Sequence, residues 1–342
     1  MSKFSIRDRK ILIVGGAGFI GHNLALRLKS LGAKVTVLDG LTVNNLYSVK
    51  KNENNLPFPK QSLKILNQRF FLLKKNKIPL KIVDARDYHK LSKVMGSVRP
   101  QVIIHLAAVS HSNRSNKDPH STFDHSLRTL ENSLDNAKNK VEQFIFLSSS
   151  MVYGNFTKNK VKEDDLCSPL GIYGALKFSA EKIIKAYGQV FGLPYTIIRP
   201  SALYGERCIS RRVGQIFIES ALNKSKIIIN GDGEEKLDFT YIEDLMNGII
   251  CSLKSKNSLQ ETFNITYGNS RTVNTLLKIL KENFTKLDVS YKKRDKLMPL
   301  RGTLDISKAK KLIGYKPMNP IETGYIKYIS WYKKFWANFK RD

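Results

Sequence analysis

The sequence predicts an α/β fold in which a doubly wound parallel sheet is joined by a second, smaller α/β lobe. Three observations support this prediction. Short β-branched runs alternate with amphipathic stretches through the N-terminal half, as in a parallel sheet flanked by helices. A glycine-rich turn follows the first of these runs, and the alternation weakens after Pro200.

Six apolar or β-branched runs are predicted as strands of this sheet, at residues 10–14, 34–38, 80–83, 101–106, 143–147 and 195–198. A helix is predicted over residues 19–31, because its leucines recur at helical spacing. Gly32 follows it and suits a left-handed helix cap. The first 40 residues therefore form one βαβ unit.

The connection after the second strand is longer than such a unit needs. Residues 41–77 are rich in Asn, Lys and Pro, and we expect them to lie over the surface with a helix near residues 62–75. Further helices are expected at residues 215–223 and 272–284, together with short strands. The aromatic-rich helix predicted at residues 325–339 is expected to pack rather than to catalyse.

The chain has 342 residues, of which 42% are hydrophobic, enough for the core of one large or two intimate domains. We predict a first domain over residues 1–200, with residues 236–262 returning to it, and a substrate-binding lobe from residues 201–235 and 263–342. The first residues show neither a membrane span nor a secretory segment. Three widely separated cysteines predict no disulfide framework and no metal site, which favours a reducing compartment such as the cytoplasm.

The formal net charge is +29, from 58 Lys and Arg against 29 Asp and Glu. An excess of this size prompts a search for a nucleic-acid surface. The densest basic part, residues 50–81, lacks the arginine-rich or aromatic-interleaved pattern of such surfaces. We interpret it as a solvated basic insertion, with polyanion binding as the alternative.

The turn after the first strand has the pattern of a dinucleotide-binding loop. Gly16, Gly18 and Gly21 give G-x-G-x-x-G, and Gly15 adds the spacing G-x-x-G-x-x-G. The turn follows a strand and opens a helix, where missing side chains let backbone N–H groups approach a pyrophosphate. These features predict a Rossmann-type cofactor site.

A carboxylate at the end of the second strand favours NAD over NADP. Asp39 lies 18 residues beyond Gly21, where it can accept hydrogen bonds from the adenosine ribose hydroxyls and repel a 2′-phosphate. Asp84 ends the third strand and could meet the adenine amino group or, alternatively, cap a helix. The predicted cofactor contacts in this half are Gly15, Gly18, Phe19, Ile20, Gly21, Asp39, Asp84, Ala85, Leu106, Ala107 and Ala108.

Tyr173 and Lys177 are four residues apart, on one face of an expected helix. A free tyrosine has a pKa near ~10, so a tyrosine base at neutral pH needs positive charge beside its phenolate. Lys177 and an oxidised nicotinamide would supply that charge. Ser149 follows the strand at residues 143–147 and can hold the same substrate hydroxyl. We predict these three residues as catalytic, with Tyr173 and Lys177 also touching the cofactor.

With these residues the chain resembles the extended short-chain dehydrogenase/reductase superfamily, specifically its NAD-dependent nucleotide-sugar epimerases and dehydratases. The likeness covers nearly the whole length, and its clearest segments are residues 11–15, 148–154, 230–233, 238–244, 304–309 and 314–317. The resemblance implies a hydride cycle. Tyr173 would remove a proton from a sugar hydroxyl, usually at C4, while NAD takes the hydride.

Residue types separate some branches of that family. Its 4,6-dehydratases and uronate decarboxylases place acidic residues where this chain has Ser150 and Met151. Neither side chain can act as a carboxyl acid or base, so water elimination and decarboxylation are disfavoured. An epimerase needs only Ser149, Tyr173, Lys177 and a ketone that can turn over. A simple reductase needs the same three residues, so that alternative stays open.

The usual diphosphate contacts of the family are altered here. Ala202 and Leu237 stand where relatives carry an Asn and an Arg that help to hold the nucleotide diphosphate. Guanidinium groups can bond two phosphate oxygens at once and are the compensating candidates, although a solvated loop is equally compatible with them. The predicted substrate contacts are Ser110, His111, Ser150, Arg207, Arg211, Arg212, Arg294 and Arg301.

The sequence therefore favours an NAD-dependent epimerase that interconverts nucleotide-activated sugars through a transient 4-keto intermediate. The first alternative is an NAD(P)-dependent dehydrogenase or reductase of a keto sugar. The second is a non-catalytic module that binds NAD or a polyanion. We expect a cytoplasmic homodimer in nucleotide-sugar metabolism and polysaccharide biosynthesis, with neither nucleic acid nor membrane as a partner.

Overall fold

The computed structural model describes residues 4–51, 56–109, 112–294 and 298–339. Within these residues the central sheet has seven strands, all parallel, in the order β12-β7-β5-β4-β1-β2-β3. The strands are β1 (Lys10–Val14), β2 (Lys34–Asp39), β3 (Leu80–Ile82), β4 (Val102–His105), β5 (Gln143–Leu147), β7 (Tyr195–Arg199) and β12 (Glu261–Asn264). The predicted doubly wound α/β class is confirmed.

The strand order reverses at β1, which lies between β2 and β4. Ile13 stands opposite Val37 on one side and opposite Ile104 on the other. All three are completely buried, as expected for a parallel sheet that is covered on both faces. Connections leave this point in opposite directions, so a crevice opens beyond the carboxyl ends of the strands.

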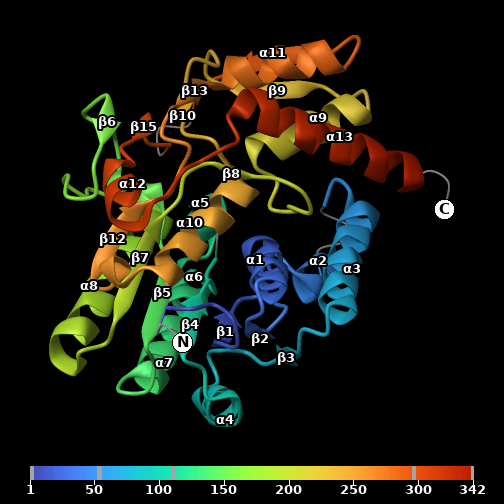
Figure 1. The fold of residues 1–342 in the computed structure, drawn as a ribbon. Coiled ribbons are helices and arrows are strands. Elements are labelled where there is room, and N and C mark those ends of the chain that lie inside the picture. Colours follow the sequence, from blue (N-terminus) through green and yellow to red (C-terminus); the bar gives the residue numbers. More distant parts are fainter. Residues whose placement is uncertain (1–3, 52–55, 110–111, 295–297, 340–342) are drawn as a thin grey trace.

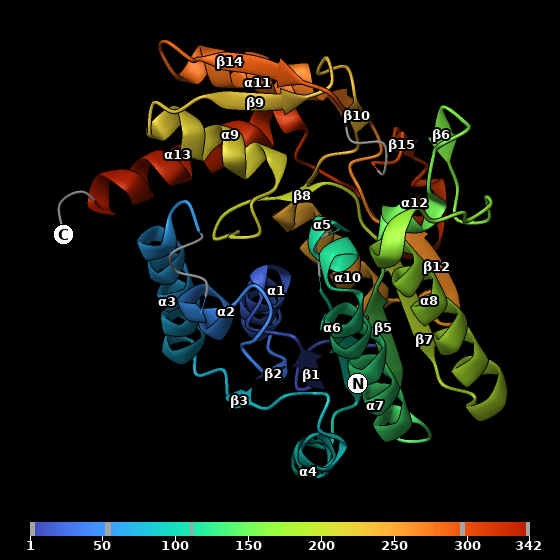
Figure 2. The same cartoon turned by 180° about the vertical axis from the view of Figure 1, so that it is seen from behind.

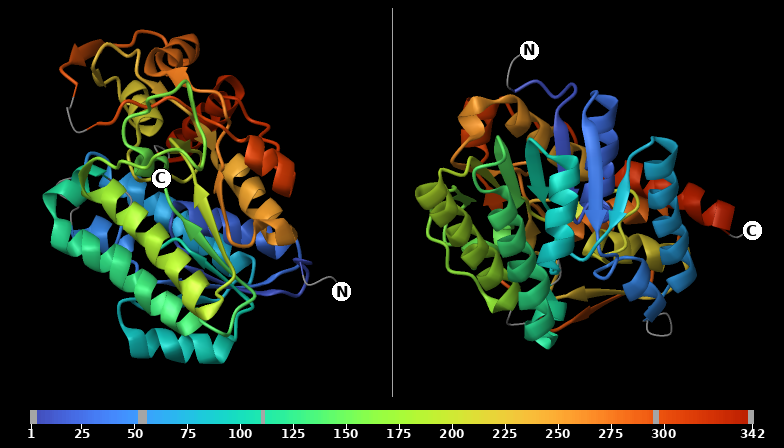
Figure 3. Two further views of the ribbon diagram at one scale, coloured as in Figure 1. Left: turned by 90° about the vertical axis from the view of Figure 1, so that its left-hand side faces the viewer. Right: turned by 90° about the horizontal axis from the view of Figure 1, so that it is seen from below.

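Helices cover both faces of the sheet (Figures 1 and 2). On one face lie α1 (Phe19–Ser30), α3 (Pro59–Lys75) and α10 (Ile242–Lys254), and on the other lie α4 (Tyr88–Val98), α7 (Thr129–Ala137) and α8 (Gly171–Phe191). Views from the side and from below show the sheet enclosed between these layers (Figure 3). The helices predicted near residues 19–31 and 62–75 are confirmed.

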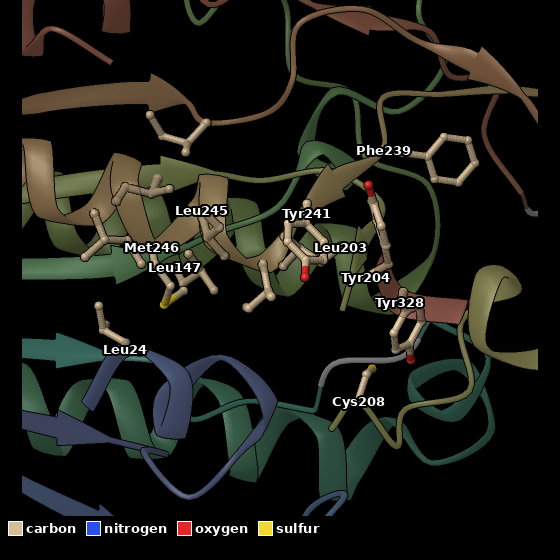
Figure 4. Packing of buried hydrophobic residues seen from close by; sticks show 14 of the residues in the cluster. Leu24, Leu147, Leu203, Tyr204, Cys208, Phe239, Tyr241, Leu245, Met246 and Tyr328 are labelled. Atoms are coloured by element: carbon tan, nitrogen blue, oxygen red, sulfur yellow. The ribbon is translucent and has the colours of Figure 1, made fainter. Parts of the chain in front are cut away.

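A smaller group of elements stands above the carboxyl edge of the sheet. It contains α9 (Val213–Leu222), α11 (Val273–Asn283), α13 (Ile321–Phe339) and the paired strands β9 (Ile227–Asn230) and β14 (Val289–Lys292). All three helices were predicted at these places. Tyrosines from this group and its connections pack together at the centre of the core (Figure 4), with the Tyr204 and Tyr241 rings 5.4 Å apart.

The remaining elements are short. They are α2 (Leu46–Lys51), α5 (Ser112–Lys117), α6 (Pro119–Phe123), η2 (Asp124–Arg128), η3 (Ser150–Tyr153), β6 (Lys160–Val161), β8 (Leu203–Tyr204), β10 (Lys236–Leu237), β11 (Thr240–Tyr241), η4 (Lys256–Ser258), β13 (Arg271–Thr272), β15 (Thr303–Leu304) and α12 (Ser307–Ile313). The predicted lobe boundary at residue 262 falls inside β12, which belongs to the central sheet. None of the described helices is both long and apolar enough to span a lipid bilayer.

Candidate active site

A cleft lies at the point where the strand order reverses. Its wall contains every predicted cofactor contact of the N-terminal half, from Gly15 to Ala108. The glycine turn after β1, the ends of β2 and β3 and the segment after β4 all contribute to it. Ile209, Ser210 and Arg212 approach from the other side and line it too. The structure therefore brings together residues that the sequence places in five separate segments.

The glycines of the turn are required by the backbone. Gly15 has a φ of +79°, and a Cβ atom built on it would lie 2.6 Å from the backbone nitrogen of Ala107. A Cβ on Gly21 would lie 2.4 Å from the Cα atom of Gly16. Among the described residues no side chain caps α1 at Gly18. The free N–H groups of its first turn are therefore available to an anionic ligand.

Asp39, the last residue of β2, is hydrogen-bonded to the glycine turn. Its carboxylate accepts hydrogen bonds from the backbone N–H groups of Ala17 at 2.9 Å and Leu41 at 2.8 Å. Burial raises the pKa of Asp39, while these two bonds and the nearby Arg69 guanidinium oppose the rise. Each carboxylate oxygen retains a lone pair that can accept a hydrogen bond from a ribose hydroxyl.

Asp84 lies in the same wall and is held by an arginine. Arg86 donates to Asp84 at 2.6 Å and to Asp124 at 3.1 Å. Burial opposes ionisation of Asp84, but the bonds from Arg86 outweigh it, so the pKa of Asp84 is lowered. The alternative that Asp84 caps a helix is wrong, because the cap of α4 is Asp87, which accepts from the N–H of Lys90 at 3.0 Å.

The three predicted catalytic residues meet beside this cleft. Tyr173 and Lys177 lie one turn apart in α8 and line a small cavity that adjoins the cleft at Ala108. Ser149 lies close enough to the Tyr173 hydroxyl to favour its ionised form. The Lys177 ammonium donates to the backbone oxygen of Leu147 at 2.6 Å. The phenol, the serine hydroxyl and the ammonium thus converge where the cleft ends.

Burial shifts the pKa values of both titratable groups away from their charged forms. It lowers the pKa of Lys177 to about 7, against the opposing charge of Glu181. It raises the pKa of Tyr173, while the Arg212 guanidinium and the Ser149 hydroxyl act in the opposite direction. A phenolate at Tyr173 therefore depends on positive charge brought close to it.

A buried network behind the catalytic residues was not predicted. Glu181 lies one turn beyond Lys177 and is paired with Arg199 at 2.6 Å. It also accepts from the Ser148 hydroxyl at 2.5 Å, and Arg199 donates to the Tyr153 hydroxyl at 2.8 Å. The network joins α8 to β5 and β7. Its signal in the sequence is a glutamate four residues after Lys177, on the helix face that is otherwise apolar.

The predicted arginines separate into two groups. Arg212 lines the cleft and acts on the pKa of Tyr173. Arg301 is buried and donates to Glu235 at 3.1 Å, and Arg212 and Arg294 both contribute to lowering its pKa, after burial itself. Arg212 therefore lies near both the catalytic tyrosine and the guanidinium groups of Arg294 and Arg301.

The other two arginines bond within the protein. Arg207 donates to His22 at 3.0 Å, and Arg211 pairs with Glu219 at 2.7 Å. Ser150 is buried at the start of η3. Ser110 and His111 lie outside the described residues. Across the described ranges, no group of three His, Cys, Asp or Glu side chains is arranged to hold a metal ion.

Comparison with known proteins gives consistent matches. A model described as the NAD dependent epimerase/dehydratase family matches residues 11–266. The putative UDP-glucose 4-epimerase of Methanocaldococcus jannaschii is 32% identical and covers 94% of this chain and 98% of its own. The uncharacterized UDP-glucose epimerase YtcB of Bacillus subtilis is 30% identical, with 94% and 97% covered.

Solved structures agree with these matches. The UDP-glucuronic acid 4-epimerase from Bacillus cereus, crystallised with UDP-glucuronic acid and NAD, superposes with a TM-score of 0.81 at 28% identity. The superposition covers 95% of this chain and 99% of that one. The UDP-glucose 4-epimerase from Thermotoga maritima gives a TM-score of 0.80 at 28% identity, with 95% and 98% covered.

Proposed function

The chain belongs to the NAD-dependent epimerase/dehydratase family, and on that premise we propose that it is an NAD-dependent epimerase of a nucleotide-activated sugar. The reaction would pass through a transient 4-keto intermediate. One observation carries the proposal. Tyr173, Ser149 and Lys177 converge at the end of a dinucleotide cleft, with Ser150 and Met151 where a dehydratase would need carboxyl groups.

The residues of the cleft fit NAD. The uncapped N-terminus of α1 suits the pyrophosphate, and the Gly15 and Gly21 positions leave space that a Cβ would fill. The Asp39 carboxylate suits the adenosine ribose hydroxyls and disfavours a 2′-phosphate. When bound, the dinucleotide would supply hydride chemistry by accepting a hydride from the sugar carbon and returning it.

The side chains of this protein would move the proton. The Tyr173 oxygen takes the proton of the C4 hydroxyl, and Ser149, which lies beside that phenol, holds the same hydroxyl in place. Because burial raises the pKa of Tyr173, its phenolate needs the positive charges of Lys177 and Arg212. The same phenol returns the proton after the ketone has turned over, which inverts C4.

The substrate diphosphate is proposed to bind at Arg212 and Arg301, with Arg294 beside them. Arg301 is paired with Glu235 at 3.1 Å, and the charges of Arg212 and Arg294 add to the burial that lowers its pKa, so positive charge accumulates at this place. A diphosphate would provide at least two further negative charges. This arrangement would compensate for Leu237 at the position of the family arginine.

The test is a panel of UDP- and GDP-sugars incubated with the purified protein and analysed by NMR. We expect a C4 epimer without added NADH. Tyr173→Phe should lower kcat by about 100-fold or more, the usual contribution of a general base. Tyr187→Phe, on the same helix and outside the cavity, is the matched control and should retain activity. Product formation that consumes NADH stoichiometrically would instead identify a reductase.

We also propose that the protein is a cytoplasmic homodimer that supplies activated sugars for polysaccharide synthesis. The support for a dimer lies on the outer face of α8. Ile172 is 36% exposed and Val190 is 71% exposed, and the exposed Ala175, Ser179 and Ala186 lie between them on the same face. Phe123 on the neighbouring α6 is 50% exposed. A second copy could bury this apolar stripe by packing helix against helix.

A further inference from the structure

Arg69 is a buried cation in the wall of the dinucleotide cleft. It lies in α3, inside the basic insertion, and its side chain is only 1% exposed. It stands close enough to Asp39 for each to affect the pKa of the other. An arginine this deeply buried is normally retained for its bonds rather than for packing.

Two of the donors of Arg69 converge on one acceptor. Its Nε atom donates to the backbone oxygen of Arg207 at 3.0 Å, and its Nη2 atom donates to the same oxygen. Its Nη1 atom is buried and has no hydrogen-bond partner within the described residues. A ligand oxygen in the cleft would satisfy that remaining donor.

The side chain of Arg207 extends the connection to α1. Its Nε atom donates to Nε2 of His22 at 3.0 Å, and its Nη2 atom donates to Asn23 at 3.2 Å. Because Nε2 of His22 is the acceptor, Nδ1 carries the proton and donates to the backbone oxygen of Gly18 at 2.9 Å. Hydrogen bonds thus run without a break from the glycine turn through His22 and Arg207 to Arg69.

The segment held by these bonds covers the cleft. Residues 205–212 carry Ile209, Ser210 and Arg212, which line the cleft opposite the glycine turn. Cys208 is buried against Tyr328, as Figure 4 shows. Two residues of the segment are in the left-handed region without being glycine, Arg207 at φ +63° and Arg211 at φ +49°. Such conformations persist only where surrounding contacts hold them.

We propose that Arg69, Arg207 and His22 form a latch that holds residues 205–212 over the bound dinucleotide and thereby sets how slowly the cofactor leaves. Arg69 is the central positioning residue of this latch, and its Nη1 atom gains its partner from the dinucleotide. The latch rests on the proposed function in one respect, since an epimerase must retain its cofactor between the two half-reactions. It assigns a role to the insertion that carries α3.

The test measures cofactor release from the whole protein. The protein is loaded with NADH, excess NAD is added, and the loss of bound NADH fluorescence gives the release rate. Arg69→Lys and Arg207→Lys keep the charge but lose the guanidinium donors, and each should release NADH about tenfold faster or more. Arg27→Lys, an exposed arginine on α1, is the control and should stay within about twofold of wild type.

A double variant separates a latch from general loosening. If Arg69 and Arg207 act through one latch, the double variant should release NADH little faster than the faster single variant, since coupled residues are not additive. Thermal unfolding shows which variants fold, and Arg207→Lys carries the test by itself if the Arg69 variant does not. Equal release rates in folded variants and wild type would overturn the latch.

The epimerase assay tests the two proposals separately. Inactivity on all sugars, with release still controlled by Arg207, would remove the proposed function and keep the latch. A wild-type protein that binds no dinucleotide would remove both proposals. Full epimerase activity with unchanged release rates in the variants would remove the latch alone.

Discussion

At the scale of single residues, Lys177 is a cation in a place that disfavours its charge. Its side chain is 7% exposed, and burial lowers its pKa to about 7. The same lysine in an unfolded chain titrates near ~10.4. Between these two values the unfolded state binds more protons than the folded state, so the free energy of unfolding rises with pH. Below pH ~7 Lys177 is protonated in both states, and burial of its charge lowers the unfolding free energy by the full amount.

Lys177→Met should therefore remove a pH dependence as well as activity. From pH 6 to pH 9 the wild type should gain roughly 2–3 kcal/mol in unfolding free energy relative to the variant, at about 1.4 kcal/mol per pH unit within the window. Urea unfolding at several pH values measures this difference. Lys182→Met, an exposed lysine on the same helix, is the control. If the unfolding free energies of wild type and Lys177→Met change with pH in the same way, the lowered pKa of Lys177 is wrong.

Substitution by alanine should have opposite effects on protein stability at two glycines. Gly15→Ala places a Cβ 2.6 Å from the Ala107 nitrogen in a left-handed conformation, so we expect loss of dinucleotide binding and a lower melting temperature. Gly96 in α4 has nothing within 4 Å of its Cβ position, so Gly96→Ala should stabilise the helix by about 0.5–1 kcal/mol. Calorimetry and retained NAD, measured together, distinguish the two. A Gly15→Ala protein that keeps its NAD would refute the role of the turn.

At the scale of elements, one buried ion pair fixes the catalytic helix to the sheet. Glu181 of α8 and Arg199 of β7 are both almost completely buried. Arg199→Met leaves the Glu181 charge without its partner and should lower the unfolding free energy by roughly 3–5 kcal/mol. Adding Glu181→Gln should recover part of that loss, because the unpaired charge is then gone. Denaturant unfolding of the wild type, the single variant and the double variant measures both effects.

An exposed ion pair provides the comparison for that prediction. Lys158 pairs with Asp165 at 2.5 Å, but the lysine is well exposed to solvent. Lys158→Met should change the unfolding free energy by less than about 1 kcal/mol. Equal losses for Arg199→Met and Lys158→Met would show that the buried pair does not anchor α8.

The elements also show why some features were predictable from the sequence and others were not. The six strands of the central sheet before Pro200 were all predicted, because most of them are apolar runs with clear boundaries, whereas the two-residue strand β6 was not. Strand β12 was missed because its four residues begin and end with polar side chains. It is identified as a strand only by its pairing with the distant β7.

In the site, too, local features were predictable from the sequence and contacts between distant residues were not. The glycine turn and the Tyr173–Lys177 pair are local spacings, which a sequence displays directly. Arg69 and Arg207 are 138 residues apart, and only the fold brings them together. A signal for Arg69 did exist, since it occupies a helical position in line with the buried Leu66 and Leu73. That Arg212 lines the cleft while Arg207 and Arg211 bond within the protein depended on the path of residues 205–212.

At the scale of the whole molecule, net charge and the apolar stripe of α8 act against each other. Each protomer carries a formal charge of +29, so two protomers repel, whereas burial of Ile172, Val190 and their neighbours favours association. Salt screens the repulsion, with a Debye length of about 10 Å at 0.1 M, and leaves apolar burial intact. The proposed dimer should therefore tighten as the salt concentration rises, opposite to an interface held by ion pairs.

Sedimentation velocity at 20 mM and 300 mM NaCl, over a range of protein concentrations, measures that trend. Ala186→Arg adds a further positive charge to the centre of the stripe and should weaken the dimer by about tenfold or more. Ala337→Arg makes the same change at an exposed site on α13 and should leave association unchanged. The stripe is not the interface if both variants associate as the wild type does. A dimer that dissociates as salt rises would show that complementary charges, and not the apolar face of α8, hold it together.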